Sequence, residues 1–152
     1  MEYGSIEREI HIDAAPEVVY EVVSRPEHLR QWWSDGAELE PEPGATGVIW
    51  FGDRSSPEAH VEQVTVVAAD PPRRFSFRWA YDQGAAAGDS LLVTFELIPS
   101  GTGTLLRLTE SGFRERGWEA AVLEERFREH VTGWDHFLPR LVTYVARLVS
   151  AP

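Results

Sequence analysis

From about residue 118 the hydrophobic period of this chain becomes that of one long helix, and that change limits the folds open to it. Up to about residue 111, apolar residues tend to alternate with polar ones, which is typical of half-buried β-strands. From about Trp118 to Val149, apolar residues recur at helical spacing in one stripe, made of Phe127, Val131, Trp134, Leu138, Leu141 and Val145. Several strands followed by one long amphipathic helix predict an α+β fold, with the helix packed across the sheet.

Six strands are expected from the runs of alternating or β-branched residues. Residues 75–79 give the clearest one, because the aromatic residues share one face and the polar residues share the other. The remaining strands are expected at residues 5–12, 47–51, 60–69, 91–98 and 104–111. Aspartate, proline, serine and glycine mark turns between strands at residues 70–72 and 100–103, and a flexible loop is expected at residues 84–88.

Two short helices are expected between the first two strands. Pro16 and Pro26 each suit the first turn of a helix, where proline removes no helical hydrogen bond. The first helix carries four valines on one side, and the second covers Glu27 to about Trp33. Residues 37–47 are rich in acids, glycine and proline, so a loop or a weak edge segment is expected there.

Length and charge set the class of protein. A chain of 152 residues can form one domain, expected over residues 1–152, that buries roughly 70% of its unfolded surface. The net charge of −11 opposes binding to nucleic acid or anionic lipid. No apolar run is long enough to cross a membrane, and no apolar signal segment is present. The absence of cysteine suits a reducing compartment, so the cytoplasm is expected.

The motifs of common catalytic, metal and cofactor sites are missing. The closest histidines, His130 and His136, are six residues apart and lie on different faces of a helix, which does not suit a metal ion. No serine lies in a G-x-S-x-G turn, and the glycines of residues 100–103 do not form a dinucleotide-binding pattern. The sequence therefore predicts no catalytic residues, no metal and no cofactor.

The aromatic residues indicate a large core or a ligand cavity. Six tryptophans, seven phenylalanines and four tyrosines are many for one small domain. Glu110 follows Leu106 and Leu108 on one strand face, so its carboxylate is expected to point inward and to need a partner. A cavity between the sheet and the long helix is expected, lined by Trp32, Trp50, Phe77, Trp79, Phe95, Leu108, Glu110, His130, Trp134 and Phe137.

Four segments together resemble a known family. Residues 6–33, 70–79, 103–113 and 133–145 are similar to the standalone bacterial relatives of the C-terminal domain of the activator of the ninety-kilodalton heat-shock chaperone ATPase. That family belongs to the START-like, SRPBCC or Bet v 1 type of helix-grip domains. The resemblance implies about seven antiparallel strands curved around the C-terminal helix, with two short helices after the first strand and a cavity that takes apolar or amphipathic ligands.

Three functions remain open at this point. The first is non-catalytic binding of a small hydrophobic or amphipathic molecule, as a carrier, a sensor or a stress-response protein. The second is an enzyme of the polyketide cyclase or dehydrase kind, in which Glu110 or His130 moves a proton. The third is a protein-interaction module that contacts a chaperone or a second copy of the chain.

Overall fold

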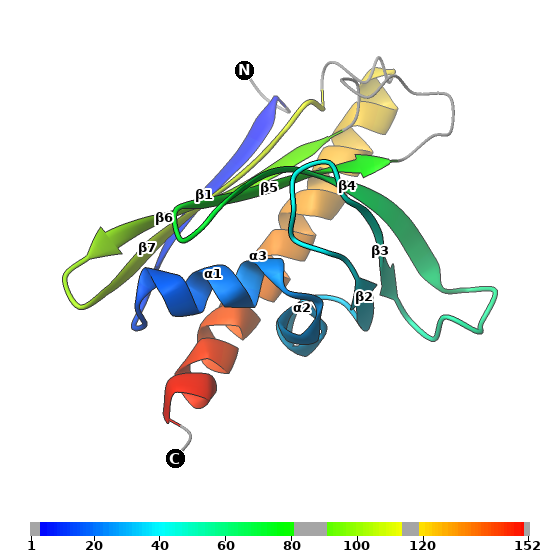
Figure 1. The fold of residues 1–152 in the computed structure, drawn as a ribbon. Helices are drawn as coiled ribbons and strands as arrows, with labels where there is room; N and C mark the ends of the chain where they lie inside the picture. Colours follow the sequence, from blue (N-terminus) through cyan, green and yellow to red (C-terminus); the bar gives the residue numbers. More distant parts are fainter. Residues whose placement is uncertain (1–3, 81–90, 114–118, 151–152) are drawn as a thin grey trace.

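The structure, a computed structural model, describes residues 4–80, 91–113 and 119–150. Within them, seven antiparallel strands form one curved sheet, and three helices lie on the same side of that sheet (Figure 1). The strands are β1 (Ser5–Ile12), β2 (Gly36–Glu38), β3 (Thr46–Phe51), β4 (His60–Asp70), β5 (Arg74–Ala80), β6 (Leu92–Ser100) and β7 (Gly103–Ser111). The helices are α1 (Pro16–Ser24), α2 (Pro26–Trp32) and α3 (Ala120–Ser150). The expected α+β helix-grip fold is confirmed.

The strand order places the first strand beside the last. Strands β2 to β7 follow one another as neighbours, and β1 pairs with β7 at the far edge, so the order is β1-β7-β6-β5-β4-β3-β2. Helices α1 and α2 carry the chain from one edge of the sheet to the other, and Pro16 and Pro26 stand at their starts, as expected. The segment of residues 84–88, expected to be a loop, lies outside the described residues.

The interior forms where the apolar faces of the sheet and of α3 meet. Five residues expected to share this interior are all buried there, namely Phe77, Trp79, Phe95, Leu108 and Trp134. Helix α3 crosses the sheet diagonally, and its buried residues are Trp134, Leu138, Leu141 and Val145 (Figure 1). The helical stripe read from the sequence is therefore the face that packs on the sheet.

One strand lies where the sequence predicts only a loop or a weak edge segment. Strand β2 is three residues long and pairs with β3 at the edge of the sheet. Gly36 lies opposite Trp50, and an added Cβ at Gly36 would overlap the indole ring of Trp50. Glycine is therefore required at residue 36, and its lack of a side chain also removed the alternation that would have indicated a strand.

No helix among the described residues has the length and hydropathy to cross a membrane.

Candidate functional site

A buried carboxylate joins the sheet to the long helix. Glu110 of β7 is 0% exposed and points to the interior, as expected. Its Oε2 accepts a hydrogen bond from the indole N–H of Trp79 on β5, at 2.9 Å. Its Oε1 accepts one from the indole N–H of Trp134 on α3, at 2.9 Å, and lies 2.8 Å from Nδ1 of His130. One side chain therefore connects two strands and the helix.

Hydrogen bonds offset the free-energy cost of burying the Glu110 carboxylate in this cluster, whose other members are Trp79, His130 and Trp134. A carboxylate has two acceptor oxygens, while each indole has one donor and needs one acceptor when it is buried. An unpaired buried carboxylate would cost several kcal/mol, but here both oxygens have partners. The cluster therefore fixes the positions of the two tryptophans and the histidine that face the neighbouring cavity.

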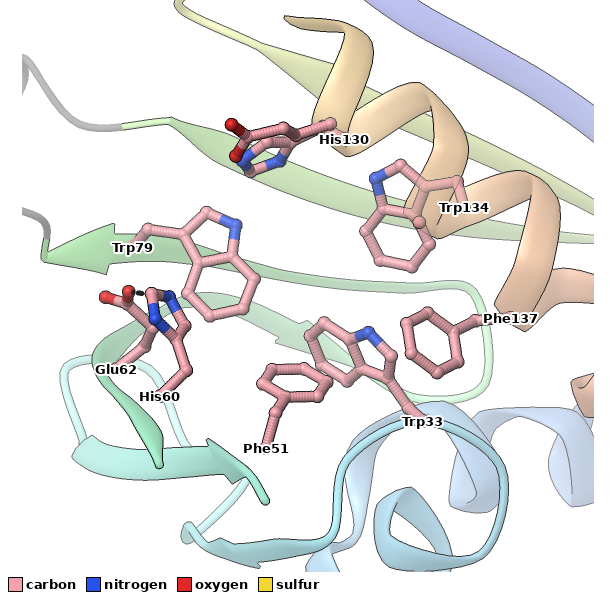
Figure 2. Close-up of a pocket in the computed structure, with 10 residues that line it drawn as sticks. Trp33, Phe51, His60, Glu62, Trp79, His130, Trp134 and Phe137 are labelled. Atoms are coloured by element: carbon pink, nitrogen blue, oxygen red, sulfur yellow. Dashed lines mark ion pairs between the residues drawn. The ribbon is translucent and has the colours of Figure 1, made fainter. Parts of the chain in front are cut away.

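The cavity lies between the sheet and α3 and has a volume of about 190 Å³. Figure 2 shows Trp79, Glu62 and His60 on one side of it, Trp134 and Phe137 on the other, and Trp33 and Phe51 between them. The described residues that line it are Trp33, Phe51, His60, Glu62, Trp79, Glu129, His130, Gly133, Trp134 and Phe137. Five of these ten residues are tryptophan or phenylalanine, so the wall is largely apolar.

Trp33 is the centre of the aromatic wall. Its ring lies between those of Trp32 and Trp134, with centroids 5.8 Å and 5.4 Å away and interplanar angles of 16° and 24°. Phe51 and Trp79 meet it edge to face, with centroids at 6.0 Å and 5.6 Å. Offset stacks and edge-to-face contacts of this kind stabilise aromatic clusters beyond the effect of burial alone. The cavity wall is therefore held in place before any ligand binds.

Polar groups meet the apolar wall at Glu62 and His60 of β4. The Glu62 side chain is 13% exposed, and its Oε1 lies 2.5 Å from Nε2 of His60, which is 67% exposed (dashed line in Figure 2). Burial raises the pKa of the Glu62 carboxyl above its ordinary value, and the nearby His60, His130 and Arg126 oppose that shift. A desolvated carboxyl in a cavity wall is a common feature of functional sites.

A second hollow, of about 640 Å³, lies at the other end of the sheet. It is formed by the start of α1, the turn between β4 and β5, and the end of β6. Its described lining includes acids, arginines and prolines but no aromatic ring. The smaller cavity is the better candidate, because aromatic walls with a few polar groups are typical of sites for small molecules.

Four of the ten residues expected at the cavity line it, namely Trp79, His130, Trp134 and Phe137. Four others lie in the core and are not part of the described lining, namely Phe77, Phe95, Leu108 and Glu110. Of these, Glu110 acts on the cavity indirectly, through its hydrogen bonds to three lining residues.

Trp32 and Trp50 require correction, because the structure places neither on the cavity wall. Trp32 is fully buried beneath α1, where its indole N–H donates to the carbonyl of Val22 at 3.0 Å. Trp50 lies on the opposite face of β3 from Phe51, since successive residues of a strand alternate. The guanidinium of Arg54 covers the Trp50 ring, 4.5 Å from its centroid.

Six residues of the described cavity lining were not expected there, and the sequence indicates the inward direction of some of them more clearly than that of others. They are Trp33, Phe51, His60, Glu62, Glu129 and Gly133. His60 and Glu62 share a strand face with the buried Val64 and Val66, so the period of two indicates that they point inward. Phe51 lies two residues after the buried Ile49 on β3, so the same period indicates that Phe51 also points inward. For Trp33 there was no signal, because α2 ends at Trp32 and the next residue leaves the helical period. Glu129 and Gly133 lie two turns and one turn, respectively, before Phe137 on α3.

Comparison with known proteins identifies relatives of this chain. Residues 13–146 match the family described as "Activator of Hsp90 ATPase homolog 1-like protein". That match covers most of the 152 residues and agrees with the resemblance carried by the four sequence segments. No curated protein matches the chain.

Solved structures share the fold over nearly the whole chain. A protein from Mesorhizobium loti is 26% identical, with a TM-score of 0.76, and the match covers 94% of this chain and 97% of that one. The Aha1 dimer from Colwellia psychrerythraea is 23% identical, with a TM-score of 0.67 and coverage of 91% and 92%. CalU16 from Micromonospora echinospora is 21% identical, with a TM-score of 0.66 and coverage of 93% and 73%. The last two, at this identity, show a common fold alone.

Proposed function

We propose that this chain, which belongs to the family of activator of Hsp90 ATPase homolog 1-like proteins, binds a small hydrophobic or amphipathic ligand without converting it. The helix-grip fold supports ligand binding in general. The single observation that carries the proposal is the cavity of about 190 Å³ walled by five aromatic side chains. A role as a carrier or sensor in the cytoplasm, with residues 1–152 acting as one domain, is part of the proposal.

The size of the cavity suggests the size of the ligand. An apolar protein cavity of roughly 150 Å³ is known to hold one benzene molecule. A volume of about 190 Å³ therefore suits an aromatic or branched apolar group with a small substituent. Burying roughly 150 Å² of apolar ligand surface contributes about 4 kcal/mol, which corresponds to an affinity of about 1 mM. Polar contacts would add to this affinity.

The geometry favours binding over proton transfer. A general base must reach the proton that it removes, either directly or through one water molecule. The Glu110 carboxylate is 0% exposed, is not part of the described cavity lining, and accepts hydrogen bonds on both oxygens. His130 lines the cavity, but its Nδ1 faces Glu110. Glu110 therefore positions the side chains around it and is not placed to take a proton from a ligand in the cavity.

Contact with another protein molecule is compatible with the family as well. One of the similar structures is that of a dimer, so this family allows contacts between copies or with other proteins. A chaperone or a second copy of the chain therefore remains a proposed additional partner, whose binding would not require the cavity.

Filling the cavity is expected to remove ligand binding while the fold is kept. Gly133 lines the cavity on α3, and an added Cβ there would meet no atom within 4 Å. In Gly133→Leu, the new side chain is expected to occupy the cavity, and loss of a helical glycine should stabilise α3 by up to about 1 kcal/mol. Isothermal titration calorimetry with 1-phenylethanol should show binding with a negative heat-capacity change for the natural chain and at least tenfold weaker binding for the variant.

The matched control is Thr132→Leu, which places the same side chain on the exposed face of the same helix turn. It is expected to bind 1-phenylethanol as the natural chain does. Equal binding by the natural chain and Gly133→Leu would mean that the probe binds elsewhere, and the proposed site would be wrong.

A further inference from the structure

The polar groups of the cavity are unbalanced in charge. Two carboxylates, those of Glu62 and Glu129, belong to the described lining, and Glu110 lies directly behind it. Among the described lining residues there is no arginine, and the chain has no lysine at all. The guanidinium of Arg126 lies 3.4 Å from Glu129 at the exposed side of α3. Among the described lining residues, the cavity therefore offers acidic groups and no permanent cation, and Arg126, whose charge also acts on Glu62, lies beside Glu129.

Glu62 is the carboxylate of the cavity wall that a ligand's hydrogen-bond donor would stabilise most. It is 13% exposed, and His60 is the hydrogen-bond partner that the described residues provide for it. Burial has removed much of its water, as the raised pKa of its carboxyl indicates. A protonated amine placed against this carboxylate would replace the lost water with a charge-assisted hydrogen bond, which is stronger than a neutral one.

Trp33 offers a donor to the same ligand. It is 6% exposed and lines the cavity, and its indole N–H donates no hydrogen bond to the part of the chain that the structure describes. Its two ring faces are occupied by Trp32 and Trp134, so an edge of the ring is what it can present to the cavity. The nitrogen is not among the fully buried polar atoms of the described residues that lack a partner, so it is accessible, and a hydroxyl or carbonyl oxygen of a ligand could accept its hydrogen bond.

We propose that the cavity selects small amphipathic amines: molecules with an apolar body of about phenyl size, a protonated amine that binds Glu62, and a hydroxyl or carbonyl oxygen that accepts from Trp33. This inference rests on the proposed binding function and specifies its ligand class. It excludes fatty acids and other carboxylates as preferred ligands, because their charge would face Glu62, Glu129 and Glu110 with no fixed cation in the described lining.

Four probes that differ in one group each test the selection. They are 2-amino-1-phenylethanol, which carries both polar groups, 2-phenylethylamine, which lacks the hydroxyl, 1-phenylethanol, which lacks the amine, and 3-hydroxy-3-phenylpropanoate, which carries a carboxylate instead of the amine. Calorimetry at pH 7.5 should show the amino alcohol binding at least tenfold more tightly than 1-phenylethanol, because a hydrogen bond to a charged group is stronger than one between neutral groups. The amine alone should be intermediate, and the carboxylate should bind weakest.

Two variants assign the preference to its residue. Glu62→Gln keeps the shape of the side chain and removes its charge, so the ratio of the affinities for the amino alcohol and for 1-phenylethanol should fall toward one. Glu40→Gln changes an exposed carboxylate outside the cavity and should keep that advantage. Equal affinity for the amino alcohol and 1-phenylethanol, or tighter binding of the carboxylate, would overturn the inference and leave the binding function intact. If no probe binds at all, the proposed function itself fails.

Discussion

A variant with alanine in place of Glu110 is expected to be less stable to unfolding by about 3–5 kcal/mol. The substitution removes the acceptor of two indole N–H groups and the partner of His130, all in the interior between β5, β7 and α3. The indole N–H groups of Trp79 and Trp134 would lose this acceptor in the interior. Because a domain of this size is stable by about 5–15 kcal/mol, the loss is a large share of the total.

Urea unfolding followed by circular dichroism measures this loss. Glu110→Gln is the milder variant, for the case that alanine prevents folding. The amide has one carbonyl oxygen, which can accept a hydrogen bond where one of the two carboxylate oxygens did, while its NH₂ group faces a donor in place of the other oxygen. The free energy of unfolding is therefore expected to fall by about 1–3 kcal/mol. Glu9→Ala is the control. Glu9, like Glu110, accepts a hydrogen bond from a side chain on another strand, but its donor is Arg107 and the pair lies on the surface. It should cost less than about 1 kcal/mol. A Glu110→Ala protein as stable as Glu9→Ala would show that the cluster does not hold the sheet to the helix.

The second large effect is expected at Trp33. Trp33→Ala removes a buried ring that contacts five other aromatic rings, and replacement of a buried tryptophan by alanine typically costs about 3–5 kcal/mol. Trp50→Ala removes the same side chain from the other face of the sheet, where the contact with Arg54 contributes about 1 kcal/mol. The two variants therefore compare equal chemical changes on the two faces.

Thermal and urea unfolding of both variants give the comparison. Trp33→Ala should also lose binding of 1-phenylethanol, whereas Trp50→Ala should keep it, because Trp50 is not part of the described cavity wall. If Trp50→Ala lost the most stability, the assignment of the two tryptophans to opposite faces would be incorrect.

Most of the fold follows from local sequence patterns. Strands such as β5 and β6 alternate cleanly because one face is buried, and α3 shows one apolar stripe for the same reason. Strand β2 has no such pattern: it is three residues long, and its first residue is a glycine that makes room for Trp50. Its pairing with β3 depends on the rest of the sheet, which a local pattern does not contain.

The candidate site was harder to predict than the fold, because a cavity depends on which buried residues leave space between them. The inward direction of Glu110 followed from its strand face, and its contact with His130 is consistent with that expectation. Trp32 and Trp33 could not be told apart in this way, since the choice depends on the residue at which α2 ends. The aromatic count indicated a cavity or a large core, but it did not show which rings face the empty space.

The most direct test of a binding cavity between the sheet and α3 is a titration with 1-phenylethanol followed through the indole N–H signals of a ¹⁵N-labelled sample. The account predicts saturable shifts for the indoles of Trp33, Trp79 and Trp134, which line the cavity, and little change for Trp50 on the other face of the sheet. Shifts confined to Trp50, or no saturable shift of the Trp33 signal, would contradict it.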